Sequence, residues 1–193
     1  MAVVCLLAGC GEETKPAAGK KEGSFFQKIP GELTDFEGKP LGVNFDPAKT
    51  TVFVFLSPDC PLCQSYTSLL SGMSDSIKAC RMQLFGVFPG SFYTPEEIEA
   101  YRSEYAVRFP CVQDKRMWLC DTLGATVTPE AFVMDVSGKI LYRGRIDDWM
   151  YDIGRKKPAP TRHDLRQALR EVCSGRKVSV PETVPVGCFI EKS

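Results

Sequence analysis

Hydrophobic residues along the chain follow two patterns, one typical of buried strands and one typical of amphipathic helices. Residues 51–56 and 84–88 are runs rich in β-branched and aromatic residues, the pattern of strands buried on both faces of a mainly parallel sheet. Residues 131–136 and 139–143 flank Ser137-Gly138, which predicts a β-hairpin with a glycine turn. These segments predict the strands of one central sheet.

Apolar residues at helical spacing predict helices between and after these strands. The clearest start is Thr94, because Pro95 and Glu97 follow it in the order of a capping box. The other helices are expected from Cys60 to about Gly72, over 115–124, and from a cap at Thr161 to Gly175. The order is therefore strand, helix, strand, helix, hairpin, helix. It predicts an α/β fold, a central mixed sheet of four or five strands flanked by helices on both faces.

The N-terminal region has a different character. Residues 1–10 form an apolar run too short to span a bilayer, which is typical of a secretory signal. Leu7-Ala8-Gly9-Cys10 resembles the bacterial lipobox, in which the chain is cut before the cysteine and the cysteine carries lipid. The basic segment that normally precedes the apolar run is missing, and a frayed apolar N-terminus is the alternative.

The expected domain organisation follows from these shifts in composition. We expect a signal peptide at 1–10, a flexible tether at 11–24, one folded domain at 25–175 and a C-terminal tail at 176–193. With lipid at Cys10, the protein would be exported and anchored on the periplasmic side of a bacterial membrane. The membrane is then one expected partner.

Composition narrows the function classes. The chain has 193 residues, 44% of them hydrophobic, enough for one domain with a full core. Lysine plus arginine equals aspartate plus glutamate at 24 each, so no overall positive field favours nucleic acid as a partner. No flavin, nicotinamide or metal motif is present, so no cofactor is expected.

Cys60-Pro61-Leu62-Cys63 is the main candidate for chemistry, because it lies where a strand gives way to a helix. Free N–H groups and the helix dipole at such a position stabilise a thiolate, so Cys60 is expected to attack and Cys63 to resolve the mixed disulfide. Pro61 suits the first helical turn. Two other interpretations stay open: an inert structural disulfide, and half of a zinc site, for which the chain offers only one histidine, His163.

Residues 53–63 and 127–148 together resemble the thioredoxin superfamily, specifically the redoxin branch. That branch contains the alkyl hydroperoxide reductase and thiol-specific antioxidant proteins and membrane-tethered thiol-disulfide oxidoreductases of the TlpA and ResA type. The likeness runs from about Leu33 to about Val172. It implies a thioredoxin-like fold in which Thr128-Pro129 carries a cis-proline that packs beside the cysteines and helps to hold the partner's backbone.

Three departures from the family pattern bear on mechanism. Asp59 stands where thioredoxins have tryptophan, and its charge is expected to raise the pKa of Cys60. Val54 replaces the buried aspartate that moves the proton of the second cysteine, so Glu130 is our candidate for that role, with an exposed strand-end glutamate as the alternative. Cys60 also occupies the place of the peroxiredoxin threonine, which leaves that motif incomplete.

Five cysteines remain after these assignments, apart from Cys5, which precedes the expected cleavage site. Cys188 lies in the tail and is a candidate third redox thiol that reaches Cys60 or Cys63, a structural partner of another cysteine, or a free thiol. The other four lie near apolar segments and are expected mostly to pack as small core residues, with a bridge between the middle two left open: Cys80, Cys111, Cys120 and Cys173.

The leading hypothesis is an exported thiol-disulfide oxidoreductase that exchanges disulfides with proteins of the cell envelope and receives electrons from another dithiol protein. The first alternative is a thiol peroxidase, in which peroxide oxidises one cysteine of the pair. The second is a copper-binding chaperone in which Cys60, Cys63 and His163 hold copper(I). The direction of electron flow is not set by the sequence.

Overall fold

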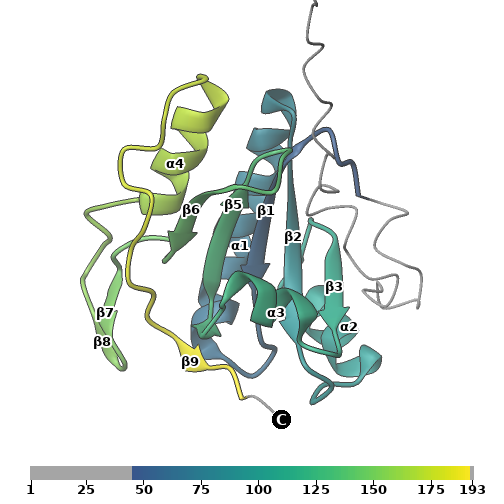
Figure 1. The fold of residues 1–193 in the computed structure, drawn as a ribbon. Helices are drawn as coiled ribbons and strands as arrows, with labels where there is room; N and C mark the ends of the chain where they lie inside the picture. The colour runs from purple at the N-terminus through teal and green to yellow at the C-terminus, as the bar shows by residue number, and fades with distance from the viewer. Residues whose placement is uncertain (1–44, 192–193) are drawn as a thin grey trace, which may run out of the picture.

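A computed structural model describes residues 45–191, which form a five-stranded mixed sheet with helices on both faces (Figure 1). The sheet order is β3-β2-β1-β5-β6. Strands β1, β2 and β3 are parallel, β5 runs antiparallel to β1, and β6 runs antiparallel to β5. The bounds are Thr50–Phe55 for β1, Met82–Pro89 for β2, Cys111–Asp114 for β3, Glu130–Met134 for β5 and Ile140–Gly144 for β6.

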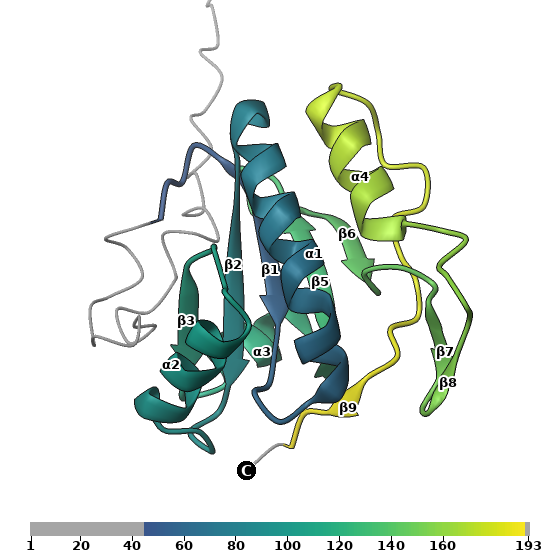
Figure 2. The same ribbon diagram turned by 180° about the vertical axis from the view of Figure 1, so that it is seen from behind.

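Helices α1, α2 and α4 cover one face of this sheet and α3 covers the other (Figure 2). Their bounds are Pro61–Ile77 for α1, Pro95–Glu104 for α2, Trp118–Leu123 for α3 and Asp164–Cys173 for α4, with a short 3-10 turn at Lys78–Cys80. The predicted α/β class, mixed sheet and helices on both faces are confirmed. Among residues 45–191, none of the helices combines the length and hydrophobicity that crossing a bilayer requires.

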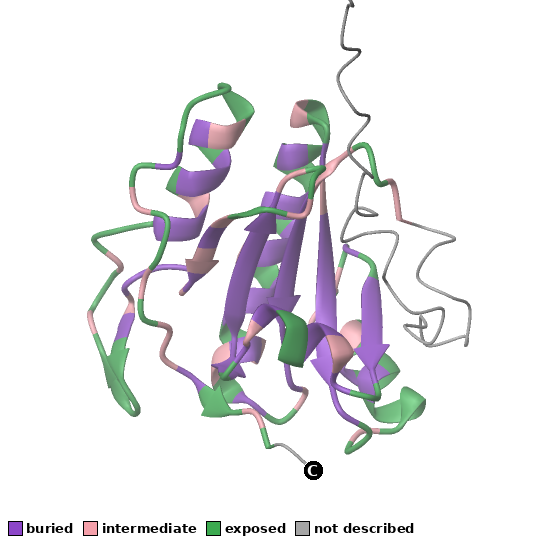
Figure 3. Ribbon diagram, viewed as in Figure 1, coloured by how far each residue is buried: buried purple, intermediate pink, exposed green. Residues whose placement is uncertain are grey.

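Strand periodicity explains the two layers of core. Val52 and Val54 pack with α1 and α4, while Phe53 and Phe55 point to the opposite face and pack with α3. All four are fully buried, so the continuous apolar run is the one expected for a central strand (Figure 3). This burial fixes the carboxyl end of β1, and the residues that follow it are Leu56 to Cys60.

Two small ladders lie outside the main sheet. Strand β4 (Val127–Thr128) pairs antiparallel with β9 (Cys188–Phe189), and β7 (Met150–Asp152) pairs with β8 (Arg155–Lys156). None of the four was predicted, because two or three residues carry no recognisable period. The C-terminal segment crosses the β6 edge before it reaches β4 (Figure 1). Residues 176–191 are therefore packed against the domain, and not a separate tail as expected.

The helix predictions were correct in type and partly wrong in extent. The capping box at Thr94 and Glu97 is present in both directions. Helix α1 continues past Gly72 to Ile77, because Met73 and Ile77 bury their side chains in the core. Thr161 does not cap α4, which begins after His163; its hydroxyl instead donates to Asp148.

The cysteine predictions need two corrections. Cys80 and Cys173 are not simple core residues, because they form a disulfide that ties the turn after α1 to the end of α4. Cys111 and Cys120 are both buried and are not part of a disulfide, as expected of residues that pack in the core. They cannot bridge, because Cys111 joins the core on the α1 side and Cys120 the core on the α3 side.

An acidic pair, Asp147-Asp148, follows β6. Asp147 and Asp148 are both buried. Asp147 accepts hydrogen bonds from the Tyr66 hydroxyl and from the Trp149 amide. Asp148 accepts from the amides of Thr161 and residue 162 and is paired with Lys157. These two carboxylates hold the loop before α4 in place.

Candidate active site around Cys60

Cys60 is the N-cap residue of α1, directly beyond the loop that follows β1. The chain passes from a buried strand into a helix, with Pro61 at the first helical position. Both cysteines of the pair are buried, Cys60 at 1% exposure and Cys63 at 0%. The sequence prediction that the pair lies at the carboxyl end of the first central strand is confirmed.

The pKa values of the two thiols are shifted in opposite directions. The pKa of Cys60 is lowered to about 5, and the largest cause is a hydrogen bond from the Cys63 thiol. Burial opposes this shift, whereas hydrogen bonds from Cys188 and from the amides of Cys63 and Leu62 add to it. Burial, followed by the neighbouring Cys60 thiolate, raises the pKa of Cys63 well above its ordinary value. At neutral pH Cys60 is therefore a thiolate and Cys63 is a protonated thiol.

The peptide bond between Thr128 and Pro129 is cis, as the resemblance implied. The carbonyl oxygen of Thr128 lies 3.3 Å from Cys60 Sγ and accepts a hydrogen bond from Cys60 when this thiol is protonated. On the other side of the pair, the amide of Ser57 donates to Cys63 Sγ at 3.4 Å. The cis-proline loop thus adjoins the reactive sulfur.

Glu130 follows the cis-proline and is 1% exposed, so the alternative of an exposed strand-end glutamate is wrong. Its carboxylate accepts hydrogen bonds from the amides of Thr126 and Val127, at 2.8 Å and 3.5 Å, and lies 3.9 Å from an Arg143 nitrogen. These contacts hold the loop that carries Thr128. They make Glu130 a positioning residue, while its proton-transfer role stays a prediction.

The expectation that Asp59 raises the pKa of Cys60 needs a correction, because the pKa of Cys60 is lowered although Asp59 is ionised beside it. Hydroxyl hydrogen bonds from Ser57 and from Tyr93, both 2.5 Å, hold the pKa of Asp59 below its ordinary value. The pKa of Cys60 is lowered all the same, because the hydrogen bonds it receives are local and direct. Tyr93 was missed in the sequence; it follows the carboxyl end of β2, where parallel strands bring their loops to one edge.

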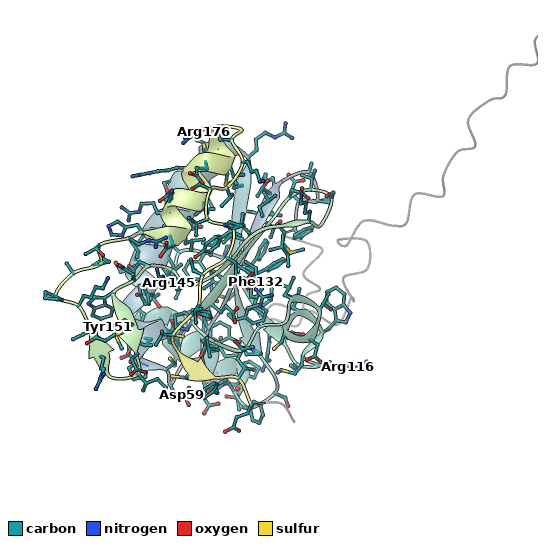
Figure 4. All side chains as sticks on the ribbon, turned by 60° about the vertical axis from the view of Figure 1, so that its left-hand side comes forward. Asp59, Arg116, Phe132, Arg145, Tyr151 and Arg176 are labelled. Atoms are coloured by element: carbon teal, nitrogen blue, oxygen red, sulfur yellow. A yellow bond between two sulfur atoms is a disulfide. The ribbon has the colours of Figure 1, made fainter. Side chains whose placement is uncertain are left out.

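Cys188 lies beside Cys60, with the two Sγ atoms 2.7 Å apart. Of the pairings left open in the sequence, those with Cys80 or Cys173 are excluded, since these two residues bond to each other. Cys188 also belongs, with Ser57, Asp59, Tyr93 and Thr128, to the lining of a pocket of about 310 Å³ at this end of the molecule. Figure 4 shows Asp59 next to strand β9, which carries Cys188.

The remaining predicted residues have no contact with the pair that bears on its chemistry. His163 is the N-cap of α4, so it lies on another element. Within residues 45–191, no group of three or more histidine, cysteine or acidic side chains is arranged to hold a metal ion. Cys10 lies outside the described residues, as do the predicted signal peptide and tether.

A family model described as the AhpC/TSA family matches residues 27–143. The chain belongs to the AhpC/TSA family. Within the thioredoxin superfamily this is the redoxin branch that the sequence resembled, and the thioredoxin-like fold is confirmed. A comparison with curated proteins finds no match.

Solved structures share the fold of this AhpC/TSA chain. A hypothetical protein of Sinorhizobium meliloti is 24% identical, with a TM-score of 0.73 over 83% of this chain and 90% of its own. An uncharacterized conserved protein of Geobacillus kaustophilus is 21% identical, with a TM-score of 0.70 over 83% of this chain and 87% of its own. StoA of Bacillus subtilis is 19% identical, with a TM-score of 0.50 over 57% of this chain and 83% of its own.

Proposed function

We propose that this protein is an exported thiol-disulfide oxidoreductase that exchanges disulfides with proteins of the cell envelope through Cys60 and Cys63. The observation that carries the proposal is that the pKa values of the two cysteines are shifted in opposite directions. Cys60 has a pKa of about 5 at the start of α1, and the Cys63 proton is retained. A structural disulfide has no need of a stabilised thiolate, whereas exchange requires one.

The reaction balances within the pair and its partner. The Cys60 thiolate attacks one sulfur of a partner disulfide, forms a mixed disulfide and releases the partner's second sulfur as a thiolate. Cys63 then gives up its proton and attacks Cys60 Sγ, which forms the Cys60–Cys63 disulfide and releases the first partner sulfur. The partner gains two electrons, the pair loses two, and the reverse sequence oxidises a partner dithiol.

Cys63 becomes a better nucleophile once the mixed disulfide has formed. Burial is the largest cause of its raised pKa, and the hydrogen bond and charge of the Cys60 thiolate come next. Both contributions of Cys60 disappear when its sulfur is bonded to the partner. The Ser57 amide hydrogen bond to Cys63 Sγ favours the thiolate and remains.

Two features support export and membrane attachment. The Leu7-Ala8-Gly9-Cys10 motif is the signal expected of a lipid-anchored protein. The Cys80–Cys173 disulfide is of the kind that persists in an oxidising compartment such as the periplasm. Electrons would come from a second dithiol protein, since the site has the chemistry of thiols alone. Attachment would be read from radiolabelled fatty acid, which is expected on the wild-type chain and not on a Cys10→Ala chain.

Turnover of a peptide disulfide, with dithiothreitol as the electron source, tests the proposed chemistry. Cys60→Ser is expected to reduce the rate at least 100-fold. A chain that carries both Cys63→Ser and Cys188→Ser, and so has no second thiol beside Cys60, is expected to stop after one mixed disulfide. The matched control is Cys120→Ala, which removes a buried cysteine that is not in a disulfide and lies on the other face of the sheet; it is expected to keep the rate within about twofold. Rapid consumption of hydrogen peroxide, with no disulfide turnover, would overturn the proposal in favour of a thiol peroxidase.

A further inference from the structure

The C-terminal segment occupies the edge beside the cis-proline. Thr128 is paired with Cys188 in the antiparallel ladder of β4 and β9. The ladder is extended by the Ile190 amide, which donates to the Thr126 carbonyl at 3.0 Å. An extended strand added to a free sheet edge is a common way to bind a peptide. Here the chain itself supplies that strand.

Close packing shows that the sequence is fitted to this position. A Cβ atom on Gly187 would lie 2.2 Å from the Thr128 carbonyl oxygen, so only glycine allows the approach. Upstream, a Cβ on Gly144 would lie 2.1 Å from the Thr183 carbonyl oxygen. The Thr183 hydroxyl also contacts the Tyr142 hydroxyl and accepts from the Arg145 amide. The segment is therefore held along its length, on both sides of Pro185.

The result is a third thiol at the reactive sulfur. Cys188 Sγ lies 2.7 Å from Cys60 Sγ, not far beyond the about 2.05 Å of a disulfide bond. When Cys60 is the thiolate, the Cys188 thiol is the donor between them. Burial, then the Cys60 thiolate, raises the pKa of Cys188 to about 12, and the part due to Cys60 is lost when Cys60 enters a disulfide.

From this geometry we propose that Cys188 is a redox-active thiol that competes with Cys63 for Cys60 and forms an internal Cys60–Cys188 disulfide. The inference rests on the proposed function and adds a second oxidised state to it. In the exchange, the Cys188 thiolate attacks Cys60 Sγ of the Cys60–Cys63 disulfide. Cys63 leaves as a thiolate and takes up the proton that Cys188 gave up, so no electrons enter or leave.

The internal disulfide has a consequence for partners. In that state β9 is covalently fixed over β4, and a partner strand cannot pair with Thr128. A protein partner then gains access only after Cys63 displaces Cys188 from Cys60 and the segment moves away. The C-terminal segment therefore occupies the place of a substrate strand, and the Cys60–Cys188 disulfide is protected from attack by other thiols.

The test is to treat the reduced Cys63→Ser chain with glutathione disulfide and identify the products by peptide mass spectrometry. Cys60 first forms a mixed disulfide with glutathione, and Cys188 is expected to displace glutathione within the molecule. The Cys60–Cys188 cross-link should exceed the glutathione adduct at least tenfold, since a neighbouring thiol outcompetes a free one. Persistence of the adduct with no cross-link would overturn the inference.

Gly187→Val provides a variant that keeps every thiol of the Cys63→Ser chain. Its side chain would collide with the Thr128 carbonyl, and the rate of cross-linking is expected to fall at least tenfold. The matched control is Val184→Ala, a change at a tail residue that is 79% exposed, and it should leave the rate within twofold. Equal cross-linking in Gly187→Val and in the control would show that the paired segment does not position Cys188, and would also overturn the inference.

Two further measurements separate this inference from the proposed function. In the wild-type chain at equilibrium with glutathione, the Cys60–Cys188 peptide should be found beside the Cys60–Cys63 peptide. The Cys188→Ser chain should still turn over a peptide disulfide through Cys60 and Cys63. Turnover with no Cys60–Cys188 peptide would overturn the inference and leave the proposed function standing. Absence of both would overturn the two together.

Discussion

Removal of the Cys63 thiol should change the acidity of Cys60 by a measurable amount. The Cys63 hydrogen bond is the largest of the effects that lower the pKa of Cys60 to about 5. A hydrogen bond to a charged group is worth about 1.5–3 kcal/mol, and one pKa unit corresponds to about 1.4 kcal/mol. Cys63→Ala is therefore expected to raise the pKa of Cys60 by about one to two units.

The fraction of thiolate gives the size of the signal. With a pKa of about 5, about 99% of Cys60 is thiolate at about pH 7, against about 3% for an ordinary cysteine with a pKa of about 8.5. The rate of alkylation at Cys60 should thus be nearly flat from about pH 7 to about pH 9 in the reduced wild type. An ordinary cysteine would become about 20-fold faster over the same range.

The assay is the pH dependence of iodoacetamide modification, followed on the Cys60 peptide and checked by the ultraviolet absorbance of the thiolate. Cys63→Ser is the matched control, because its hydroxyl can still donate to Cys60, and its profile should lie between those of wild type and Cys63→Ala. A wild-type midpoint near that of an ordinary thiol would refute the reasoning. So would identical midpoints for wild type and Cys63→Ala.

The lowered pKa of Cys60 also makes the free energy of unfolding depend on pH. The pKa of Cys60 is lower in the folded reduced protein than in the unfolded chain, so folding favours the thiolate. This contribution is complete above the unfolded pKa of about 8.5–9 and is lost as the pH falls to about 5. In urea unfolding of the reduced protein, the contribution of Cys60 to the free energy of unfolding should therefore be largest at about pH 9 and should decrease as the pH falls. Cys60→Ser should remove this pH dependence.

Three further predictions concern the frame of the site. Glu130→Gln should lower the free energy of unfolding, measured in urea, by about 1–3 kcal/mol, because it weakens the acceptor of two loop amides. The control is Glu182→Gln, at a residue whose side chain is 70% exposed, and it should change the free energy of unfolding by less than about 0.5 kcal/mol. Joint replacement of Cys80 and Cys173 by serine should cost about 2–5 kcal/mol in the same assay, because the disulfide closes a long loop; equal stability with and without dithiothreitol would contradict this. Thr94→Ala should cost about 1 kcal/mol through loss of the capping box, and a change below about 0.3 kcal/mol would show that the cap contributes little.

Features set by local pattern could be predicted from the sequence. The run from Thr51 to Leu56 identified β1, because a strand that is buried on both faces consists mostly of apolar residues. The capping box at Thr94 identified the start of α2 for an equally local reason. The cysteine pair at the end of β1 and the cis bond before Pro129 were predicted in the same way, from the pair itself and from the family resemblance.

Features set by contacts between distant segments could not be predicted. The β4–β9 ladder joins residues 60 positions apart at Thr128 and Cys188, and neither strand is long enough to show a period. The Cys80–Cys173 disulfide spans 93 positions, and cysteine spacing alone does not identify partners. Thr161 was expected to cap a helix, but its hydroxyl donates a hydrogen bond to Asp148, a buried residue 13 positions away.

The most direct test of the account is the reduction potential of the Cys60–Cys63 couple, measured by equilibration with glutathione in the Cys188→Ser chain. A pKa of about 5 is about two units below that of thioredoxin, and each unit of thiolate stabilisation favours the reduced form by about 30 mV. Relative to about −270 mV for thioredoxin, we expect the couple to equilibrate reversibly at about −210 mV. A pair that fails to equilibrate in the folded protein would be a buried structural bridge and would contradict the central claim.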